Sequence, residues 1–279
     1  MTMNESQLRE LTLSVCGVAR QAGGYIASER QKFSLASVER KHAHDYVSYV
    51  DKGSEDLIVA ALRKLLPEAG FITEEGSAGH DREQLIWVID PLDGTTNFIH
   101  RYAPYAVSIA LVQGSDILLG VVYEVTASEC YYAWRGGGAY MNGEAIRVSS
   151  QRMEDALLCL QLPYNSEAYK PVVKKLMDHF YGRCASIRMS GSAAMSLCYV
   201  AIGRLDGYAE RYIGRWDYMA GALIVCEAGG RVTDYSGSTD FNRGDSIIAT
   251  NGIVHAEMAE AVYEHSMAVP AHTRVDLRQ

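Results

Sequence analysis

Residues 87–97 read WVIDPLDGTTN, and this stretch decides how the rest of the chain is interpreted. The apolar run Leu85–Ile89 predicts a buried strand that ends at Asp90. Asp93 follows three residues later, with Pro91 between the two acids. Because proline restricts the backbone, both carboxylates can point at one cation, and a hard divalent metal accepts oxygen ligands.

Gly94 and Thr95 add a feature of a phosphate site to this acidic pair. Glycine allows the backbone to come close to a ligand, and the two amides can donate to phosphate oxygens if a turn or helix begins there. The same residue types also form plain turns. This segment alone therefore leaves both interpretations open.

Other carboxylates decide between these interpretations by their combination. Glu74 and Glu75 close the short strand expected at Phe71–Thr73, and Glu75 by itself is best explained as a solvated loop end. Asp217 comes just before an expected helix, where Asp is a common N-cap. Glu210, taken alone, is expected to be an exposed surface charge.

Composition indicates a folded globular protein and argues against several other classes. The 279 residues are 48% hydrophobic, enough for one large domain or two tightly joined halves. No apolar run reaches membrane-spanning length and no signal peptide is recognisable, so we expect a cytoplasmic protein without a membrane partner. The net charge of -8 and the lack of a basic stretch argue against nucleic acid. The cysteines are expected to be reduced core residues: Cys16, Cys130, Cys159, Cys184, Cys198 and Cys226.

Hydrophobic periodicity predicts an N-terminal α+β half, about 1–150, and a C-terminal α/β half, about 151–266, of one catalytic domain, with a tail at 267–279. We expect the active site where the halves meet. Helices are predicted at 5–30, 51–66, 166–181, 193–202, 218–227 and 254–265. Strands are predicted at 71–73, 85–89, 157–162, 231–235 and 246–250, with an antiparallel meander at 106–112, 117–125 and 129–134.

These motifs together resemble the inositol monophosphatase family, the lithium-sensitive, Mg²⁺-dependent sugar and inositol phosphatases. The resemblance spans nearly the whole chain and implies an α+β layered sandwich with alternating α-β-α-β-α layers, similar to inositol monophosphatase and fructose-bisphosphatase. It is carried by Lys41 with Asp45 and Asp51, and by the segments FITEE (71–75), WVIDPLDGTTNF (87–98) and WDYMAGA (216–222).

The resemblance also implies a metal site with two or three Mg²⁺ ions. Glu74, Asp90 and the Leu92 carbonyl would hold one ion, and Asp90, Asp93 and Asp217 a second. So many carboxylates cannot gather without a counterion, because their mutual repulsion raises their pKa values or opens the site.

Roles in catalysis and substrate binding are implied in the same way. Glu74 and Thr95 would orient and activate a water that the metal binds, with Asp51 holding Thr95. The substrate, a small phosphate ester, would contact eight residues: Asp93, Gly94, Thr95, Gly191, Ser192, Ala193, Glu210 and Asp217. The segment Ser190–Ala194 can equally be a helix cap. A homodimer is expected from the family.

The substrate remains open at this stage. Inositol monophosphate leads, but Thr73, Ser48, Ser192 and the segment Arg211–Arg215 depart from the usual family pattern. The alternatives are a sugar phosphate, histidinol phosphate, an NADP-type phosphate or a 3′-phosphoadenosine nucleotide. A non-catalytic phosphate-binding or interaction module is the alternative outside enzymes. Zinc is a weak alternative that rests on His42 and His44, without a third nitrogen or sulfur ligand.

Overall fold

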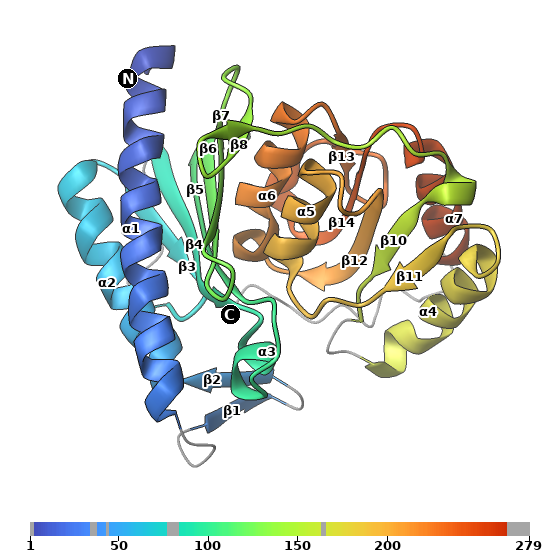
Figure 1. Ribbon diagram of the computed structural model, residues 1–279, viewed down its shortest axis with the longest axis horizontal. Coiled ribbons are helices and arrows are strands. Elements are labelled where there is room, and N and C mark those ends of the chain that lie inside the picture. Colours follow the sequence, from blue (N-terminus) through green and yellow to red (C-terminus); the bar gives the residue numbers. More distant parts are fainter. Residues whose placement is uncertain (1–2, 34–37, 43–44, 77–83, 163–165, 267–279) are drawn as a thin grey trace.

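The first layer of the protein is a pair of helices, α1 (Glu5–Lys32) and α2 (Tyr49–Leu65) (Figure 1). The computed structural model describes residues 3–33, 38–42, 45–76, 84–162 and 166–266. The predicted tail at 267–279 and His44 lie outside these residues. Both helices begin at capping boxes, with Asn4 as N-cap of α1 and Ser48 as N-cap of α2. Such caps satisfy amides that have no partner inside a helix.

The second layer is a seven-stranded sheet that contains the predicted meander. Its order is β3-β4-β5-β6-β7-β8-β9; β3 and β4 run parallel, and all other neighbours are antiparallel. The strands are β3 (Gly70–Thr73), β4 (Leu85–Asp93), β5 (Ala106–Gln113), β6 (Asp116–Glu124), β7 (Glu129–Trp134), β8 (Ala139–Met141) and β9 (Glu144–Ala145).

Both faces of this sheet are buried, and side chains alternate between them. In β5, Val107, Ile109 and Leu111 pack in the core shared with α1 and α2. Ala106 and Ala110 point into a second core on the opposite face. This period of two is the reason that continuous apolar strands occupy an inner layer of the protein.

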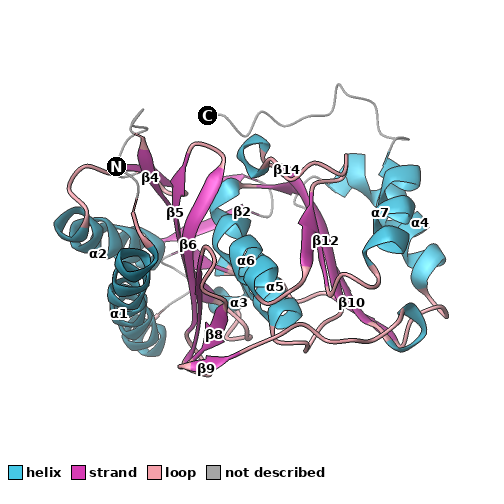
Figure 2. Cartoon of the chain, turned by 90° about the horizontal axis from the view of Figure 1, so that it is seen from above, coloured by secondary structure: helices cyan, strands magenta, loops and turns pink. Residues whose placement is uncertain are grey.

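The remaining layers complete an α-β-α-β-α sandwich, as predicted (Figures 1 and 2). The middle layer is α5 (Ala193–Ala201) and α6 (Arg215–Glu227), followed by a five-stranded sheet of order β11-β10-β12-β14-β13. Helices α4 (Ser166–Phe180) and α7 (His255–Ser266) cover its outer face. The strands of this sheet are β10 (Leu157–Leu160), β11 (Ser186–Arg188), β12 (Gly207–Ile213), β13 (Arg231–Thr233) and β14 (Asp245–Thr250).

Several elements differ from the sequence-based prediction. Strand β4 extends to Asp93, α6 begins at Arg215, and the strands β8, β9, β11 and β12 were not predicted. Four small elements were also not predicted: β1 (Val38–His42), β2 (Asp45–Ser48) and the 3-10 helices Met153–Asp155 and Phe241–Arg243. Phosphate binding by the amides of Gly94 and Thr95 required a turn or helix to begin there. The short helix α3 (Thr95–Ile99) does begin at Thr95.

The cysteines are all free, as predicted, but the prediction that all six lie in the core is wrong for two. Cys226 is exposed near the end of α6, and Cys184 is half-buried. The apolar segment around Cys226 had suggested a core position, but the residue lies on the exposed side of α6. None of the described helices is both long and apolar enough to span a bilayer.

Candidate active site

Asp90 and Asp93 lie at the end of β4, where its pairing with β5 is interrupted. The register with β5 shifts between these two residues. The Leu92 amide donates to Asp90 Oδ1 at 2.9 Å, and the Ser54 hydroxyl donates to the Pro91 carbonyl at 2.9 Å. These bonds fix the bend around the proline and bring both carboxylates to one side of the strand end.

Glu74 reaches the same place from the neighbouring strand. It directly follows β3, which is parallel to β4, and its amide donates to the Ile89 carbonyl at 3.2 Å. Since the ends of parallel strands meet at one edge of a sheet, the Glu74 carboxyl comes into hydrogen-bond contact with Asp90. The structure thus brings together the two carboxyl groups that the sequence places at strand exits.

Asp217 completes the cluster from the other half of the chain. Carboxylate oxygens of Asp90, Asp93 and Asp217 all lie within 4.8 Å of one another. Among the described residues, this is the group of acidic, His or Cys side chains that could hold a metal ion.

Asp217 is not the N-cap of its helix, and that interpretation is wrong. Helix α6 begins two residues earlier, with Gly214 as N-cap, and the Asp217 carboxylate accepts the Gly214 amide at 2.7 Å. The side chain therefore closes the first turn from inside the helix. This bond fixes its direction beside the ends of the strands.

Burial and mutual repulsion strongly affect the ionisation of these acids. Burial raises the pKa of Asp90 well above its usual value, and the nearby charges of Glu74, Asp93 and Asp217 raise it further. Burial, Glu74 and Asp93 likewise raise the pKa of Asp217. Burial raises the pKa of Asp93 to about 6, although hydrogen bonds from Ser192 and nearby amides oppose this effect.

No Lys or Arg side chain pairs with Asp90, Asp93 or Asp217 within the described part of the chain. Buried carboxylates at this separation need a cation, and an oxygen-only donor set suits Mg²⁺. The residues present therefore fit the predicted metal, and the Leu92 carbonyl belongs to the same turn.

Thr95 and Asp51 form the predicted hydrogen bond beside this cluster. The Thr95 hydroxyl lies 2.9 Å from Asp51 Oδ1 and 3.0 Å from the Leu92 carbonyl. Asp51 is buried in the first turn of α2, where its other oxygen accepts from the amide and hydroxyl of Ser48. The carboxylate thus holds the Thr95 hydroxyl in a fixed orientation.

The start of α5 is bound directly to Asp93. The Ser192 hydroxyl donates to the Asp93 carboxylate, and the amides of Ala193 and Ala194 donate to it at 3.2 and 3.0 Å. Ser192 is also the N-cap of α5, accepting the Met195 amide at 3.2 Å. The helix-cap interpretation of this segment is therefore confirmed, and the cap faces the acidic cluster.

Asn97 is a site residue whose role the sequence interpretation missed. Its side-chain amide donates to the carbonyls of Ser190 and Pro104, both at 2.8 Å. Gly191 has a φ of 75°, and a Cβ there would lie 2.7 Å from Asn97 Oδ1, so only glycine fits. The position of Asn97 at the end of the DGTTN motif was the available signal.

Glu210 is not the exposed surface charge that its sequence context suggested. It is half-buried on β12, and the Tyr208 hydroxyl donates to its carboxylate. Burial raises its pKa to about 8, and the charge of Asp93 adds to this effect. The charge of Glu210 in turn raises the pKa of Asp217, so Glu210 lies close to the acidic cluster.

The fold and this cluster define a class of protein: layered α/β proteins with a cluster of carboxylates that could hold a metal ion. The model of the inositol monophosphatase family matches residues 7–267. The chain belongs to the inositol monophosphatase family.

Known relatives agree with this assignment but carry different names. The chain is 38% identical over 254 residues to the protein named "Nus factor SuhB" from Escherichia coli, covering 90% of this chain and 95% of the relative. It is 36% identical over 246 residues to "Inositol-1-monophosphatase" from Mesorhizobium japonicum, covering 88% of this chain and 92% of the relative. A solved structure of an IMPase from Thermotoga maritima superposes with a TM-score of 0.83 at 32% identity, covering 91% and 97% of the two chains.

Proposed function

We propose that this protein is a Mg²⁺-dependent phosphatase that hydrolyses a small phosphate monoester. The observation that carries the proposal is the convergence of Asp90, Asp93 and Asp217 with Glu74 in contact. These residues come from two strand ends and a distant helix, so a chance turn does not explain the arrangement.

The metal would be held by Glu74, Asp90, Asp93, Asp217 and the carbonyl of Leu92. When bound, Mg²⁺ neutralises phosphoryl oxygens and lowers the pKa of water, so no side-chain nucleophile is required. The remaining chemistry belongs to the chain itself.

Thr95 is suited to orient the attacking water. Its hydroxyl proton is directed to Asp51 Oδ1 and the Leu92 carbonyl, so the lone pairs of Thr95 Oγ1 remain free to accept a hydrogen bond from water. The Glu74 carboxylate next to Asp90 can receive the proton that the water loses. A water aligned in this way attacks the phosphorus opposite the departing alcohol.

The alcohol half of the substrate would lie between the start of α5 and β12. Here Ser192 and the Ala193 amide donate to Asp93, and Glu210 is close enough for the charge of Asp93 to raise its pKa. Carboxylates and hydroxyls that converge in this way select a substrate rich in hydroxyl groups. Inositol monophosphate therefore leads our proposal, ahead of sugar phosphates, histidinol phosphate and nucleotide phosphates.

The test is phosphate release from a panel of these esters, with Mg²⁺, with a chelator, and with Li⁺. We expect turnover that needs Mg²⁺, is inhibited by Li⁺ and is fastest with inositol monophosphate. Asp93→Asn should abolish turnover at an unchanged fold, because it removes ligand charge with little change in volume. Asp178→Asn, at an exposed position of α4, is the matched control. Turnover of Asp93→Asn at the wild-type rate would overturn the site assignment.

A second candidate is an interaction role without catalysis, favoured by relatives that are named "Nus factor". If the interaction role is correct, the native protein can be replaced by Asp93→Asn in its host cells without a change in growth, although phosphate release is lost. A growth defect that matches the loss of turnover would exclude this second candidate.

A further inference from the structure

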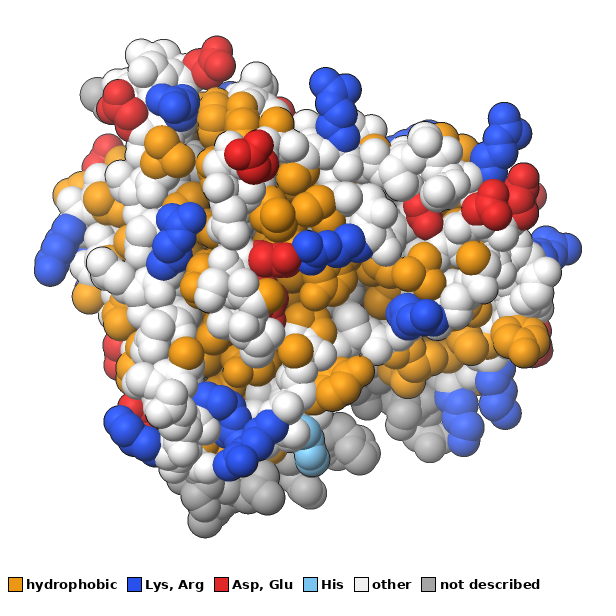
Figure 3. Space-filling view, viewed as in Figure 1, with side chains coloured by type: hydrophobic (Ala, Val, Ile, Leu, Met, Phe, Trp, Pro, Cys, Tyr) orange, Lys and Arg blue, Asp and Glu red, His pale blue; other side chains and the backbone are white. Residues whose placement is uncertain are grey.

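A pocket of about 340 Å³ lies beside the C-terminal end of α1, away from the acidic cluster. Its lining includes Arg30, Arg101, Tyr102, Tyr105 and Thr126, and contains none of the predicted metal ligands. Figure 3 shows Lys and Arg side chains gathered on this face over α3 and the adjoining end of α1. The volume is at the lower end of the range for small-molecule sites, roughly 300–1,000 Å³.

Arg30 carries an unsatisfied donor into this part of the molecule. Its Nη1 is buried and has no hydrogen-bond partner among the described residues. Its guanidinium lies over the rings of Phe33 and Phe98, at 5.2 and 5.0 Å from their centroids. A buried N–H without an acceptor is costly, so an acceptor bound in the pocket would stabilise this arrangement.

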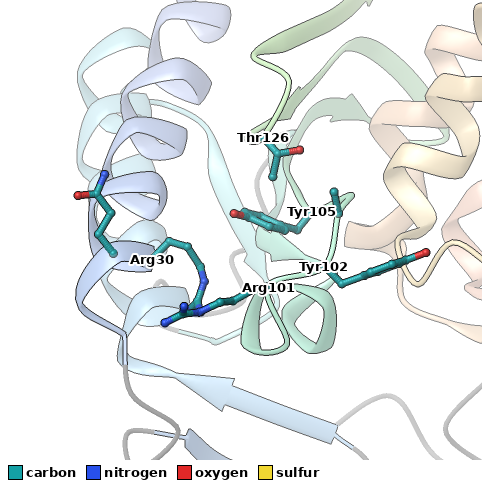
Figure 4. A pocket seen from close by; sticks show the side chains of 7 residues that line it. Arg30, Arg101, Tyr102, Tyr105 and Thr126 are labelled. Carbon is teal, nitrogen blue, oxygen red and sulfur yellow. The ribbon is translucent and has the colours of Figure 1, made fainter.

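Arg101 brings a second positive charge against the first. Figure 4 shows the ends of the Arg30 and Arg101 side chains next to each other. Desolvation and the charge of Arg101 both lower the pKa of Arg30. Neither guanidinium forms an ion pair within the described ranges of the chain. Two adjacent guanidiniums repel each other unless an anion lies between them.

Nearby polar groups determine which ligand fits. The Tyr105 hydroxyl has no hydrogen-bond partner among the described residues, so it is available to donate. The nearby Glu124 carboxylate is buried and accepts from the Thr126 hydroxyl and the Ala127 amide, so it is already occupied. The pocket thus offers donors and net positive charge.

We propose that this pocket binds the phosphate group of a small anionic ligand at a second site, separate from the acidic cluster. A phosphate group offers more oxygen acceptors and more negative charge to the two guanidiniums than one carboxylate does. Guanidinium groups also match the geometry of phosphate oxygens better than any other side chain.

The site is positioned to influence the catalytic residues. Arg101 follows α3, the helix that begins with Thr95 and includes Asn97. A ligand that holds Arg101 would therefore also hold the short helix that carries Thr95.

Binding of inorganic phosphate by the full chain, measured by calorimetry with Mg²⁺ and with a chelator, tests the proposal. In the chelator the acidic cluster repels phosphate, so binding that persists there reports the pocket. Arg101→Asn removes one guanidinium while Asn tolerates the φ of 58° at this position. We expect phosphate affinity in chelator to fall at least about tenfold in Arg101→Asn.

Two more variants test whether phosphate binding depends on the arginines of the pocket. Arg152→Asn, at an exposed position outside the pocket, should bind phosphate as the wild type does. Arg30→Gln should weaken phosphate binding as Arg101→Asn does. It replaces Arg101→Asn in this test if Arg101→Asn lowers the melting temperature. Absence of phosphate binding in chelator, or wild-type affinity in both pocket variants, overturns the proposal.

Two further arms identify the ligand. Stronger binding of a non-hydrolysed phosphonate ester than of inorganic phosphate would show that the ligand carries its phosphate on an organic group, and equal affinity would show free phosphate as the ligand. Citrate that binds as tightly as phosphate would refute recognition of phosphate. Because this readout is binding without turnover, it is independent of whether the proposed phosphatase activity is found.

Discussion

Substitution of Asp51 by Asn tests the hydrogen bonds behind Thr95 most directly. Asp51 Oδ2 accepts from the Ser48 amide at 2.8 Å and from the Ser48 hydroxyl at 2.6 Å, and Oδ1 accepts from Thr95. Asn keeps the shape but replaces one acceptor oxygen with an NH₂ donor. Because the Ser48 amide can only donate, we expect the remaining oxygen to stay there and the NH₂ group to face Thr95.

The Thr95 hydroxyl would then accept a hydrogen bond where it now donates one. Its proton would turn fully toward the Leu92 carbonyl, 3.0 Å away, and the lone pair that orients water would be occupied. A hydrogen bond to a charged group contributes about 1.5–3 kcal/mol. If that contribution is lost only in the transition state, kcat falls roughly 10- to 150-fold at an almost unchanged KM.

Steady-state phosphate release at saturating Mg²⁺ measures this effect. Asp56→Asn, an exposed position on the same helix, is the matched control and should keep the wild-type kcat. In the double variant Asp51→Asn/Thr95→Val, the first substitution should cost little beyond Thr95→Val alone, because both remove one interaction. Wild-type kcat in Asp51→Asn, or fully additive losses in the double variant, would refute the reasoning.

Two further predictions concern other buried polar groups. Asn97→Asp cannot donate to the two carbonyls that Asn97 now binds. We therefore expect the free energy of unfolding, measured in urea, to fall by about 2–4 kcal/mol and the KM to rise. An unchanged KM would show that Asn97 has no part in substrate binding. Burial lowers the pKa of His255 from 6.5 to about 4. As the pH falls from 6.5 toward 4, the unfolded chain therefore binds a proton at this residue and the native protein does not. The full shift gives a loss of about 2 kcal/mol in the free energy of unfolding between about pH 7.5 and 5, and we expect about 1–2 kcal/mol after solvent screening. His255→Gln should not show this loss of stability, whereas His100→Gln, at an exposed position, should show it as the wild type does. Equal pH dependence of the wild type and both variants in urea unfolding would contradict the assignment of the loss to His255.

The sequence predicted the part of the site that depends on local order along the chain. Glu74 and Asp90 each follow an apolar strand, so their meeting followed from the parallel pairing of β3 and β4. A helix cap within Ser190–Ala194 was one of two predicted roles for this segment, because serine often precedes a helix, and the cap is Ser192. Its replacement of the usual family threonine preserves the hydroxyl that binds Asp93.

The sequence could not predict features that depend on the packing of distant segments. Strand β12 was missed because Glu210 and Arg211 interrupt its apolar pattern, and only the folded structure shows that Glu210 is half-buried near Asp93. The extra turn at the start of α6 was missed for a similar reason. Arg215 and Trp216 give no start signal, and the bond that fixes the helix start comes from Asp217 inside the first turn.

Asp93 explains why the acidic cluster forms where the two halves of the chain meet. Its carboxylate ends a strand of the seven-stranded sheet and accepts three hydrogen bonds from the start of α5, which packs toward the five-stranded sheet. The positive end of that helix offsets part of the charge of Asp93, which is consistent with a pKa of only about 6 despite complete burial. Asp90 lacks such donors from a helix start and is in hydrogen-bond contact with Glu74, so its pKa is raised much further. A cation in the cluster would therefore neutralise Asp90 most and would, through Asp93, bind both halves of the protein at once.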